Sequence, residues 1–298
     1  MNELISFLEN QDVEYQKGKM LSALTSVGIG GVAKLFISPN SKEKFAKTLK
    51  YLYDNKIRHH IVGNMTNILP SDDDIESVLV STLKIDRCTV EDKTVYADCG
   101  VLFSRLIQRA GKNSLGGYEA LFGIPGTVGA MLSINAGAYG VSASDFLNTV
   151  EVYDSRDGYM MTLKKEDVAF FYRGSELKKQ GLTVLGATFS LIPSDKQKIN
   201  YKIKQTIDKR KATQPIGSKT LGSVFKRTDS LPASFMIDRC GLKGIRIGNI
   251  EVSEKHAGFF VNKGGGTSSD FLKLTEIVKN KVKQKYGITL EEEFEYLI

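Results

Sequence analysis

Residues 123–129 read Gly-Ile-Pro-Gly-Thr-Val-Gly, and this stretch carries the strongest local signal in the chain. Three glycines at three-residue spacing, one of them after a proline, favour a tight turn with exposed main-chain amides. Because no side chain blocks them, such amides suit the oxygens of a diphosphate. An ordinary turn between strands would have the same pattern, so this motif alone leaves both interpretations open.

The motif is neither of the two common nucleotide-binding loops. No Gly-Lys-Ser/Thr follows it, which excludes a Walker loop, and its last glycine is spaced differently from that of the dinucleotide fingerprint. Residues 135–140, Asn-Ala-Gly-Ala-Tyr-Gly, then add small side chains and one side-chain amide. We expect these residues to leave space for a flat ligand.

Composition points to a globular protein with an anionic partner. The chain has 298 residues, 41% hydrophobic and 25% charged, and a net charge of +7 with a pI near 9.1. This length favours two domains, or one large domain with a subdomain. The basic residues are spread over 42–50, 196–211 and 273–285, and tryptophan is absent. Solvated helix faces and phosphorylated small molecules therefore explain the charge better than nucleic acid does.

The cysteines and the N-terminus indicate a cytoplasmic protein. Cys88, Cys99 and Cys240 have no metal-type spacing, and their odd number gives no disulfide framework. The first residues carry Glu3 and Glu9 rather than a basic patch before an apolar run. No apolar stretch reaches the length of a membrane span. We expect no metal site, no membrane contact and no nucleic-acid partner.

Hydrophobic periodicity predicts mixed helices and strands. Apolar residues at helical spacing predict helices at 41–53, 101–110, 195 onward and 267–287. Thr267 and Gly287 suit the start and the end of the last helix. Strands are expected at 58–62, 78–83, 89–91, 94–98, 149–153, 159–163, 183–192 and 289–297. Because helices and strands do not alternate strictly, the predicted fold class is α+β.

The two glycine motifs resemble the flavin-binding core of the UDP-N-acetylenolpyruvoylglucosamine reductase family. Further segments match this family in the same order: Gly28–Ala33, Gly63–Asn67, Phe171–Ser175, Gly222–Lys226, Gly241–Gly244, Val252–Ala257 and Leu290–Glu293. The resemblance runs from about residue 25 to the end. Between Ser175 and Thr183 there is no room for the inserted substrate-clamping loop of the longer class, so the chain resembles the shorter class.

The resemblance implies a fold, a reaction and two cofactors. The fold is a PCMH-type FAD-binding region at 1–210, with subdomains about 18–78 and 79–210. A substrate-binding domain at 211–298 follows, with a C-terminal strand carrying Glu293. The reaction is the NADPH-dependent, FAD-mediated reduction of UDP-N-acetylglucosamine enolpyruvate to UDP-N-acetylmuramate, in peptidoglycan precursor synthesis. The partner is a small-molecule UDP-sugar, and the protein is expected to be a monomer.

The resemblance also assigns roles to individual residues. Arg173 is the cation that stabilises charge on the substrate carboxylate, Ser223 is the proton donor, and Glu293 assists the stabilisation. On a strand, Glu291 and Glu295 would share a face with Glu293, and only the family register selects Glu293. Implied substrate contacts are Tyr172, Lys226, Arg227 and His256. Implied flavin contacts are Gly63, Asn64, Met65, Thr66, Asn67, Gly123, Ile124, Pro125, Gly126, Thr127, Gly129, Asn135 and Gly137.

Some positions depart from the family pattern. Met65 and Thr66 stand where the family usually has glycine and serine, so either Met65 has a left-handed backbone or its loop follows another path. Arg227-Thr228 replaces an asparagine-proline pair, which affects the expected nucleotide contacts. Two alternatives stay open: an FAD-dependent oxidase of the same superfamily, and a degenerate, non-catalytic nucleotide-binding protein. A basic nucleic-acid-binding module ranks below both.

Overall fold

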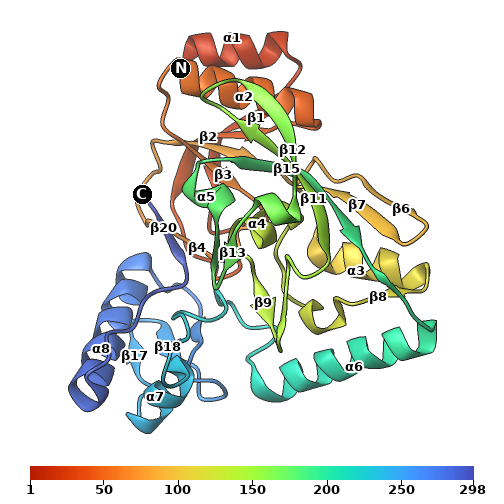
Figure 1. Ribbon diagram of the computed structural model, residues 1–298. Coiled ribbons are helices and arrows are strands. Elements are labelled where there is room, and N and C mark those ends of the chain that lie inside the picture. The colour runs from red at the N-terminus through yellow and green to blue at the C-terminus, as the bar shows by residue number, and fades with distance from the viewer. The chain divides into compact units, whose positions relative to one another are not determined.

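The computed structural model describes residues 1–298 (Figure 1). The chain divides into two compact units. The first unit comprises Met1–Lys17, Leu35–Asn64 and Ser77–Asp208, and the second comprises Gly18–Lys34, Met65–Glu76 and Lys209–Ile298. The break after Asp208 lies near the expected boundary at 210, while residues 18–34 and 65–76 cluster with the C-terminal segment. The domain limits implied by the family stay a prediction.

A four-stranded sheet has the order β1-β2-β5-β3. Its strands are β1 (Glu14–Met20), β2 (Val32–Ser38), β3 (His59–Val62) and β5 (Val78–Ser81). All residues of β5 are buried, and β5 pairs in parallel with both β2 and β3. This agrees with the rule that central parallel strands are buried on both faces.

Helix α1 (Asn2–Asn10) precedes β1, and helix α2 (Lys42–Asp54) follows β2. The Ser41 hydroxyl caps α2 by accepting a hydrogen bond from the Lys44 amide at 3.2 Å. Phe45, Leu49 and Leu52 are fully buried on one face of the helix. The helix predicted from this spacing is therefore confirmed.

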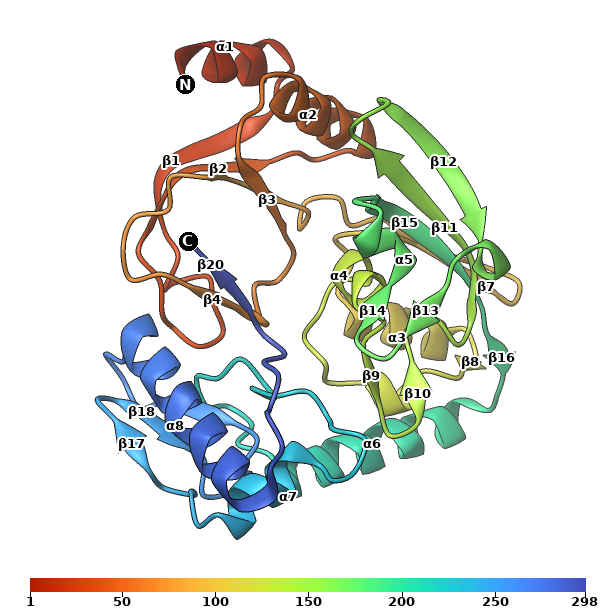
Figure 2. The same cartoon turned by 60° about the vertical axis from the view of Figure 1, so that its left-hand side comes forward.

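An antiparallel five-stranded sheet has the order β12-β11-β15-β7-β6. Its strands are β6 (Cys88–Glu91), β7 (Thr94–Asp98), β11 (Leu147–Asp154), β12 (Tyr159–Lys164) and β15 (Thr183–Ser190). The strands expected at 149–153 and 159–163 form the hairpin β11–β12, which turns through residues 155–158 (Figure 2). Helices α3 (Phe103–Lys112) and α4 (Val128–Ser133) pack against this sheet. Edge-to-face contacts of Phe103, Tyr118 and Phe189 fill the core of this unit.

Short elements complete the first unit. They are β8 (Leu115–Gly116), η1 (Glu119–Leu121), β9 (Gly137–Ala138), β10 (Val141–Ser142), η2 (Lys165–Asp167), β13 (Phe170–Phe171), β14 (Gly174–Ser175), α5 (Glu176–Lys179) and β16 (Ile192–Pro193). The hairpin β9–β10 turns through Tyr139 and Gly140, whose φ angles are 53° and 81°. Two successive positive φ angles in a two-residue loop define a type I′ turn. The long helix α6 (Lys196–Thr213) follows.

The second unit contains a three-stranded sheet of β17 (Arg246–Ile247), β18 (Ile250–Val252) and β19 (Phe260–Asn262), and two helices, α7 (Ala233–Arg239) and α8 (Ser268–Tyr286). Helix α8 packs against β17 and β18 (Figure 2). The Thr267 hydroxyl caps α8 and Gly287 ends it with φ 69°, as predicted. The predicted apolar face is buried: Phe271, Leu274, Val278 and Val282.

The C-terminal strand is shorter than expected, which corrects the prediction of a strand at 289–297. Strand β20 spans only Glu295–Leu297 and pairs in parallel with β4 (Ile68–Pro70). The residues before it have another partner, because Glu293 donates its amide to the Val224 oxygen at 2.8 Å and Lys226 donates to the Glu291 oxygen at 2.9 Å. Glu293 therefore precedes the strand rather than lying on it. None of the helices combines the length and the apolar composition needed to cross a bilayer.

Candidate active site

In the first unit, the structure brings together two motifs that are far apart in the sequence. The Asn64 side chain donates a hydrogen bond to the Pro125 main-chain oxygen at 2.8 Å. A Cβ on Gly63 would lie 2.6 Å from the Thr127 hydroxyl oxygen, so only glycine allows this approach. The end of β3 and the 123–129 loop therefore form one local arrangement.

The glycines of this loop serve close packing within the unit. Gly129 donates its amide to the Cys99 oxygen at 2.9 Å, and a Cβ there would lie 3.0 Å from the Cys99 Cβ. Thr127 caps α4 through its hydroxyl, which accepts from the Ala130 amide at 3.4 Å. Burial raises the pKa of the Cys99 thiol to about 12, so this cysteine stays protonated and is no nucleophile. Gly123 turns the chain with φ 88°.

Several main-chain amides in these loops donate no hydrogen bond to another protein group. In the first unit they belong to Asn64, Gly126 and Thr127. An amide that finds no acceptor in the protein must find one in water or in a ligand. Diphosphate oxygens are strong acceptors of this kind. The end of β3 and the 123–129 loop of the first unit therefore fit the diphosphate of a dinucleotide such as FAD.

Met65 has a left-handed backbone with φ 49°, and only 4% of its surface is exposed. The alternative that its loop follows a path with an ordinary Met65 conformation is therefore wrong. Eight non-glycine residues have a positive φ, and four of them lie in the family-like motifs: Met65, Asn135, Tyr139 and Arg173. Backbone strain of this kind concentrates at functional sites.

The 135–140 motif forms the hairpin β9–β10 and the residues leading into it. A Cβ on Gly137 would lie 2.9 Å from the Val141 oxygen, so the hairpin itself requires this glycine. The Asn135 side chain accepts from the Ser144 amide at 3.2 Å and donates to the Phe171 oxygen at 3.3 Å. This motif therefore contacts the turn that carries Arg173.

Arg173 lies in the turn between β13 and β14, with φ 55°. Its Nη1 donates to the Gly137 oxygen at 3.2 Å, and its guanidinium lies over the Tyr172 ring at 5.3 Å from the centroid. The Tyr172 side chain is more than half exposed. Arg173 is half-buried, and its guanidinium is held by a main-chain acceptor of the 135–140 motif.

The second unit brings together Asn67, Ser223 and Glu293. The Asn67 amide group donates to the Glu293 main-chain oxygen at 2.9 Å, and the Glu293 amide donates to Val224, the neighbour of Ser223. The Ser223 hydroxyl makes no hydrogen bond within the protein. Beside it, Gly222 has φ 84° and open space where a Cβ would be. The backbone of Glu293 therefore lies beside the segment that carries the Ser223 hydroxyl.

The other glutamates of the acidic tract have different partners. Glu292 forms an ion pair with Lys279 at 2.7 Å, and Glu291 forms one with Lys226 at 3.2 Å. Lys226, an expected phosphate contact, thus already has an acidic neighbour, and Arg227 after it is exposed. The carboxylates of Glu291 and Glu292 therefore each pair with a lysine of the second unit.

His256 lies in a turn beside the Ser223 segment, because the oxygen of Gly258 accepts from the Val224 amide. Its Nδ1 accepts from the Gly258 amide at 3.2 Å, which places the proton of the neutral ring on Nε2. Burial lowers the pKa of His256, and the nearby Lys243 adds to this shift. His256 is therefore a neutral donor through Nε2.

The 28–33 motif belongs to the second unit. The Ser26 hydroxyl donates to the Thr220 oxygen at 2.6 Å, and the Asn262 side chain donates to the Val27 oxygen at 2.9 Å. A Cβ on Gly31 would lie 2.3 Å from the Asp73 oxygen, so this loop requires glycine. Ser26 and Val27 directly precede the 28–33 motif. The bond from Ser26 to Thr220 therefore joins the start of this motif to the segment that carries Ser223.

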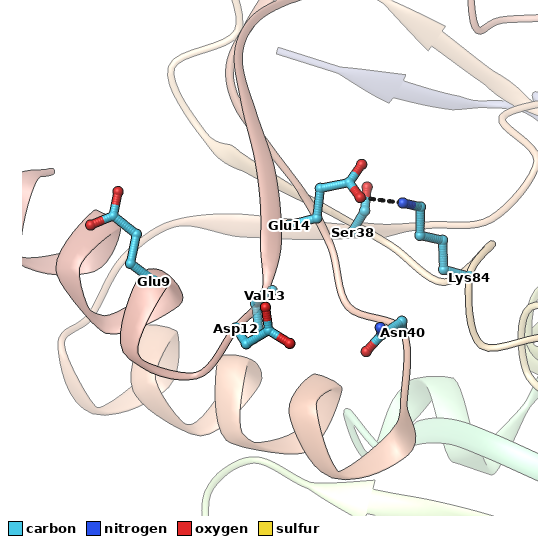
Figure 3. Close-up of a pocket in the computed structure, with 7 residues that line it drawn as sticks. All are labelled: Glu9, Asp12, Val13, Glu14, Ser38, Asn40 and Lys84. Carbon is cyan, nitrogen blue, oxygen red and sulfur yellow. Dashed lines mark hydrogen bonds and ion pairs between the residues drawn. The ribbon is translucent and has the colours of Figure 1, made fainter.

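A separate polar pocket of about 400 Å³ lies in the first unit and contains none of the candidate residues (Figure 3). Its lining residues are Glu9, Asp12, Val13, Glu14, Ser38, Asn40 and Lys84. Its carboxylates already have partners, since Glu14 pairs with Lys84, Asp12 with Lys44, and Glu9 accepts from the Tyr15 hydroxyl. We therefore do not assign the reaction to this pocket.

Family models match both parts of the chain. The model described as FAD binding domain matches residues 33–164, and the model described as UDP-N-acetylenolpyruvoylglucosamine reductase, C-terminal domain, matches residues 214–297. The predicted α+β class, with a PCMH-type FAD-binding region followed by a C-terminal substrate domain, is confirmed. The fold and the glycine loops thus define a flavoprotein oxidoreductase with FAD as its cofactor.

Relatives specify the family. The UDP-N-acetylenolpyruvoylglucosamine reductase of Clostridium tetani is 36% identical over 98% of this chain and 94% of its own length. That of Pseudothermotoga lettingae is 38% identical over 97% of this chain and 99% of its own length. The crystal structure of this reductase from Thermus caldophilus matches with a TM-score of 0.80 and 28% identity, covering 96% of this chain and 99% of that one. The chain belongs to the UDP-N-acetylenolpyruvoylglucosamine reductase family, whose members are NADPH-dependent flavoproteins.

Proposed function

We propose that this chain reduces UDP-N-acetylenolpyruvoylglucosamine to UDP-N-acetylmuramate with NADPH, and that Arg173, Ser223 and Glu293 are its catalytic residues. The observation that carries the residue assignment is the hydrogen bond from the Glu293 amide to Val224. This contact supports the assignment because it joins the backbone of Glu293 to the segment of Ser223. The family relatives support the reductase over both the oxidase and the non-catalytic alternative.

The glycine loops of the first unit would hold the FAD diphosphate through the amides that lack a protein acceptor, those of Asn64, Gly126 and Thr127. FAD bound there would supply hydride chemistry, by which a hydride from NADPH reaches the terminal alkene carbon of the substrate. The chain must then stabilise the electron pair that this addition moves onto the substrate carboxylate.

Arg173 performs that stabilisation. A guanidinium can bind both oxygens of a carboxylate, and its charge is worth most where the negative charge increases during the reaction. Glu293 supports the same carboxylate by hydrogen bonding, because two neighbouring carboxyl groups favour a shared proton over two charges. Both groups therefore lower the energy of the substrate enolate.

Ser223 completes the reaction by donating the proton of its hydroxyl oxygen to the substrate carbon that bears the carboxylate. A hydroxyl is a weak acid, so it serves only a strongly basic carbon held close to it. The hydroxyl is available because no protein group accepts its hydrogen bond. The net change is one hydride and one proton added across the double bond.

The remaining candidates bind the nucleotide part of the substrate. Lys226 and Arg227 supply positive charge for the diphosphate, Tyr172 supplies an exposed ring and hydroxyl, and His256 supplies a neutral donor through Nε2. We further infer a cytoplasmic monomer without nucleic-acid or membrane partner. The three cysteines are free, as in a reducing compartment. Size-exclusion chromatography with light scattering tests the monomer.

The test of the function uses the purified protein. We expect a yellow protein whose absorbance bleaches on addition of NADPH and recovers when UDP-N-acetylenolpyruvoylglucosamine is added, with UDP-N-acetylmuramate identified by mass spectrometry. Bleaching without recovery would reject the substrate, and bleaching that reverses only with oxygen would favour an oxidase. A colourless protein that cannot be reconstituted with FAD would reject the enzyme.

A further inference from the structure

We propose that Asn135 is a positioning residue that holds the turn carrying Arg173, rather than a residue that binds the flavin. The role rests on the proposed function, because it takes Arg173 as the cation for the substrate carboxylate. It changes the assignment of Asn135 that the family resemblance implied.

Both polar atoms of the Asn135 side chain already bind main-chain groups. Its Oδ1 accepts from the amide of Ser144, a residue that is 5% exposed, and leaving this buried amide without an acceptor would cost stability. Its Nδ2 donates to the Phe171 oxygen at 3.3 Å. The side chain thus connects Ser144, just after β10, with the turn that follows Phe171, and both of its polar atoms already have a main-chain partner.

The turn needs such a support because its backbone is strained. Strands β13 and β14 pair Phe171 with Gly174, so Tyr172 and Arg173 form a two-residue loop. Arg173 has φ 55°, a left-handed conformation that costs a non-glycine residue roughly 1–2 kcal/mol. Conformations of this kind persist only where surrounding contacts fix them.

Three hydrogen bonds fix this turn to the 133–137 segment. Asn135 binds the Phe171 oxygen, Arg173 binds the Gly137 oxygen at 3.2 Å, and the Ser175 hydroxyl donates to the Ser133 oxygen at 2.7 Å. Of these three bonds, only that of Asn135 comes from a side chain outside the turn. It holds the main chain at Phe171, just before Tyr172. Its loss should therefore let the guanidinium leave its position while the fold stays intact.

Two substitutions separate the side chain from the backbone. Asn135→Asp keeps the size, the tolerance for a left-handed backbone and the acceptor for Ser144, but it places an oxygen against the Phe171 carbonyl. Asn135→Gly keeps the backbone freedom and removes both contacts. A matched control is Asn55→Asp, because Asn55 makes the same kind of bond, Nδ2 to the Tyr51 oxygen at 2.8 Å, outside every candidate motif.

We expect Asn135→Asp and Asn135→Gly to lower kcat/KM for the UDP-sugar by roughly 10- to 100-fold, the cost of a small misplacement of a catalytic group. FAD affinity and the rate of bleaching by NADPH should stay at the wild-type level. Asn55→Asp should resemble the wild type throughout. Weaker FAD binding by Asn135→Asp would overturn the proposal and restore the flavin-contact role.

A double-mutant cycle with Arg173→Ala shows whether Asn135 acts through Arg173. In the Arg173→Ala protein, Asn135→Asp should cause little further loss of substrate affinity or of single-turnover rate. A loss as large as in the wild-type background would reject the positioning role. If Arg173→Ala itself reduces the substrate normally, the proposed function of Arg173 fails instead, so the two failures are distinguishable.

Discussion

The side chain of Asn67 donates a hydrogen bond to the main-chain oxygen of Glu293 at 2.9 Å, across a sequence separation of 226 residues. Asn67 directly precedes β4 and Glu293 lies just before β20, and these two strands pair in parallel. The Glu293 amide is bound as well, to Val224. The backbone of the proposed catalytic acid is therefore fixed on both sides, by a loop residue and by the segment of Ser223.

The first prediction separates Glu293 from its neighbour. Glu293→Gln should reduce substrate turnover strongly, because the group that assists the carboxylate is lost. Glu292→Gln should keep nearly normal turnover, since Glu292 forms an ion pair with Lys279 that is worth at most about 1 kcal/mol for partly exposed groups. Steady-state kinetics with the UDP-sugar and thermal denaturation measure both effects. Equal losses of turnover would contradict the assignment of Glu293.

The second prediction separates the two halves of the reaction at Ser223. In the Ser223→Ala protein, NADPH should still bleach the flavin at the wild-type rate. Product formation should fall by about 10²–10⁴-fold, as for loss of a general acid. Because the hydroxyl has no protein partner, the substitution should leave the melting temperature nearly unchanged. Stopped-flow mixing resolves the two steps. Equal slowing of bleaching and product formation would show that Ser223 is not the proton donor.

The third prediction concerns Met65, whose backbone is left-handed and whose side chain is buried. If FAD binding maintains this strain of roughly 1–2 kcal/mol, Met65→Gly should raise the affinity for FAD by roughly five- to thirty-fold. Met65→Asn should raise the affinity for FAD less, since asparagine tolerates this conformation only partly. Titration of the apoprotein with FAD measures the affinities.

Met65→Ala is the control for packing, because it shortens the buried side chain and keeps the backbone strain. We expect FAD to bind this variant no more tightly than the wild type. If Met65→Gly and Met65→Ala weaken FAD binding equally, packing rather than backbone strain governs the affinity for FAD.

The fourth prediction concerns the pH dependence of stability through His256. Burial lowers the pKa of His256 below its ordinary value of 6.5, so the unfolded chain binds this proton more readily than the folded one. The neutral ring's contribution to stability is therefore fully present above about pH 6.5. It is lost as the pH falls below that value toward the lowered pKa of the folded state. Urea unfolding at pH 7.5 and at pH 5.5 should show this decrease.

His256→Asn keeps an acceptor for the Gly258 amide and cannot take up the proton. Its free energy of unfolding should change less between the two pH values than that of the wild type. An unchanged pH dependence would mean that another group causes the decrease.

The sequence by itself determined the regular elements whose pattern is local. Helix α8 has its cap at Thr267, its apolar face and its end at Gly287 where the residues predict them, because capping and burial act within a few turns. Strand β7 begins and ends where predicted. The ordered motifs also sufficed for the family, since glycines that allow close approach leave a recognisable spacing.

Only the tertiary structure decided which partner each site residue has. The acidic tract has the alternation of a strand, but Glu292 and Glu293 pair with the Val224–Phe225 segment and β20 starts only at Glu295. The side-chain amide of Asn135 resembles a ligand contact in sequence, yet it binds Ser144 and Phe171. Hydrogen bonds between residues far apart in the chain depend on how the loops pack, and the local pattern of residues does not encode that packing.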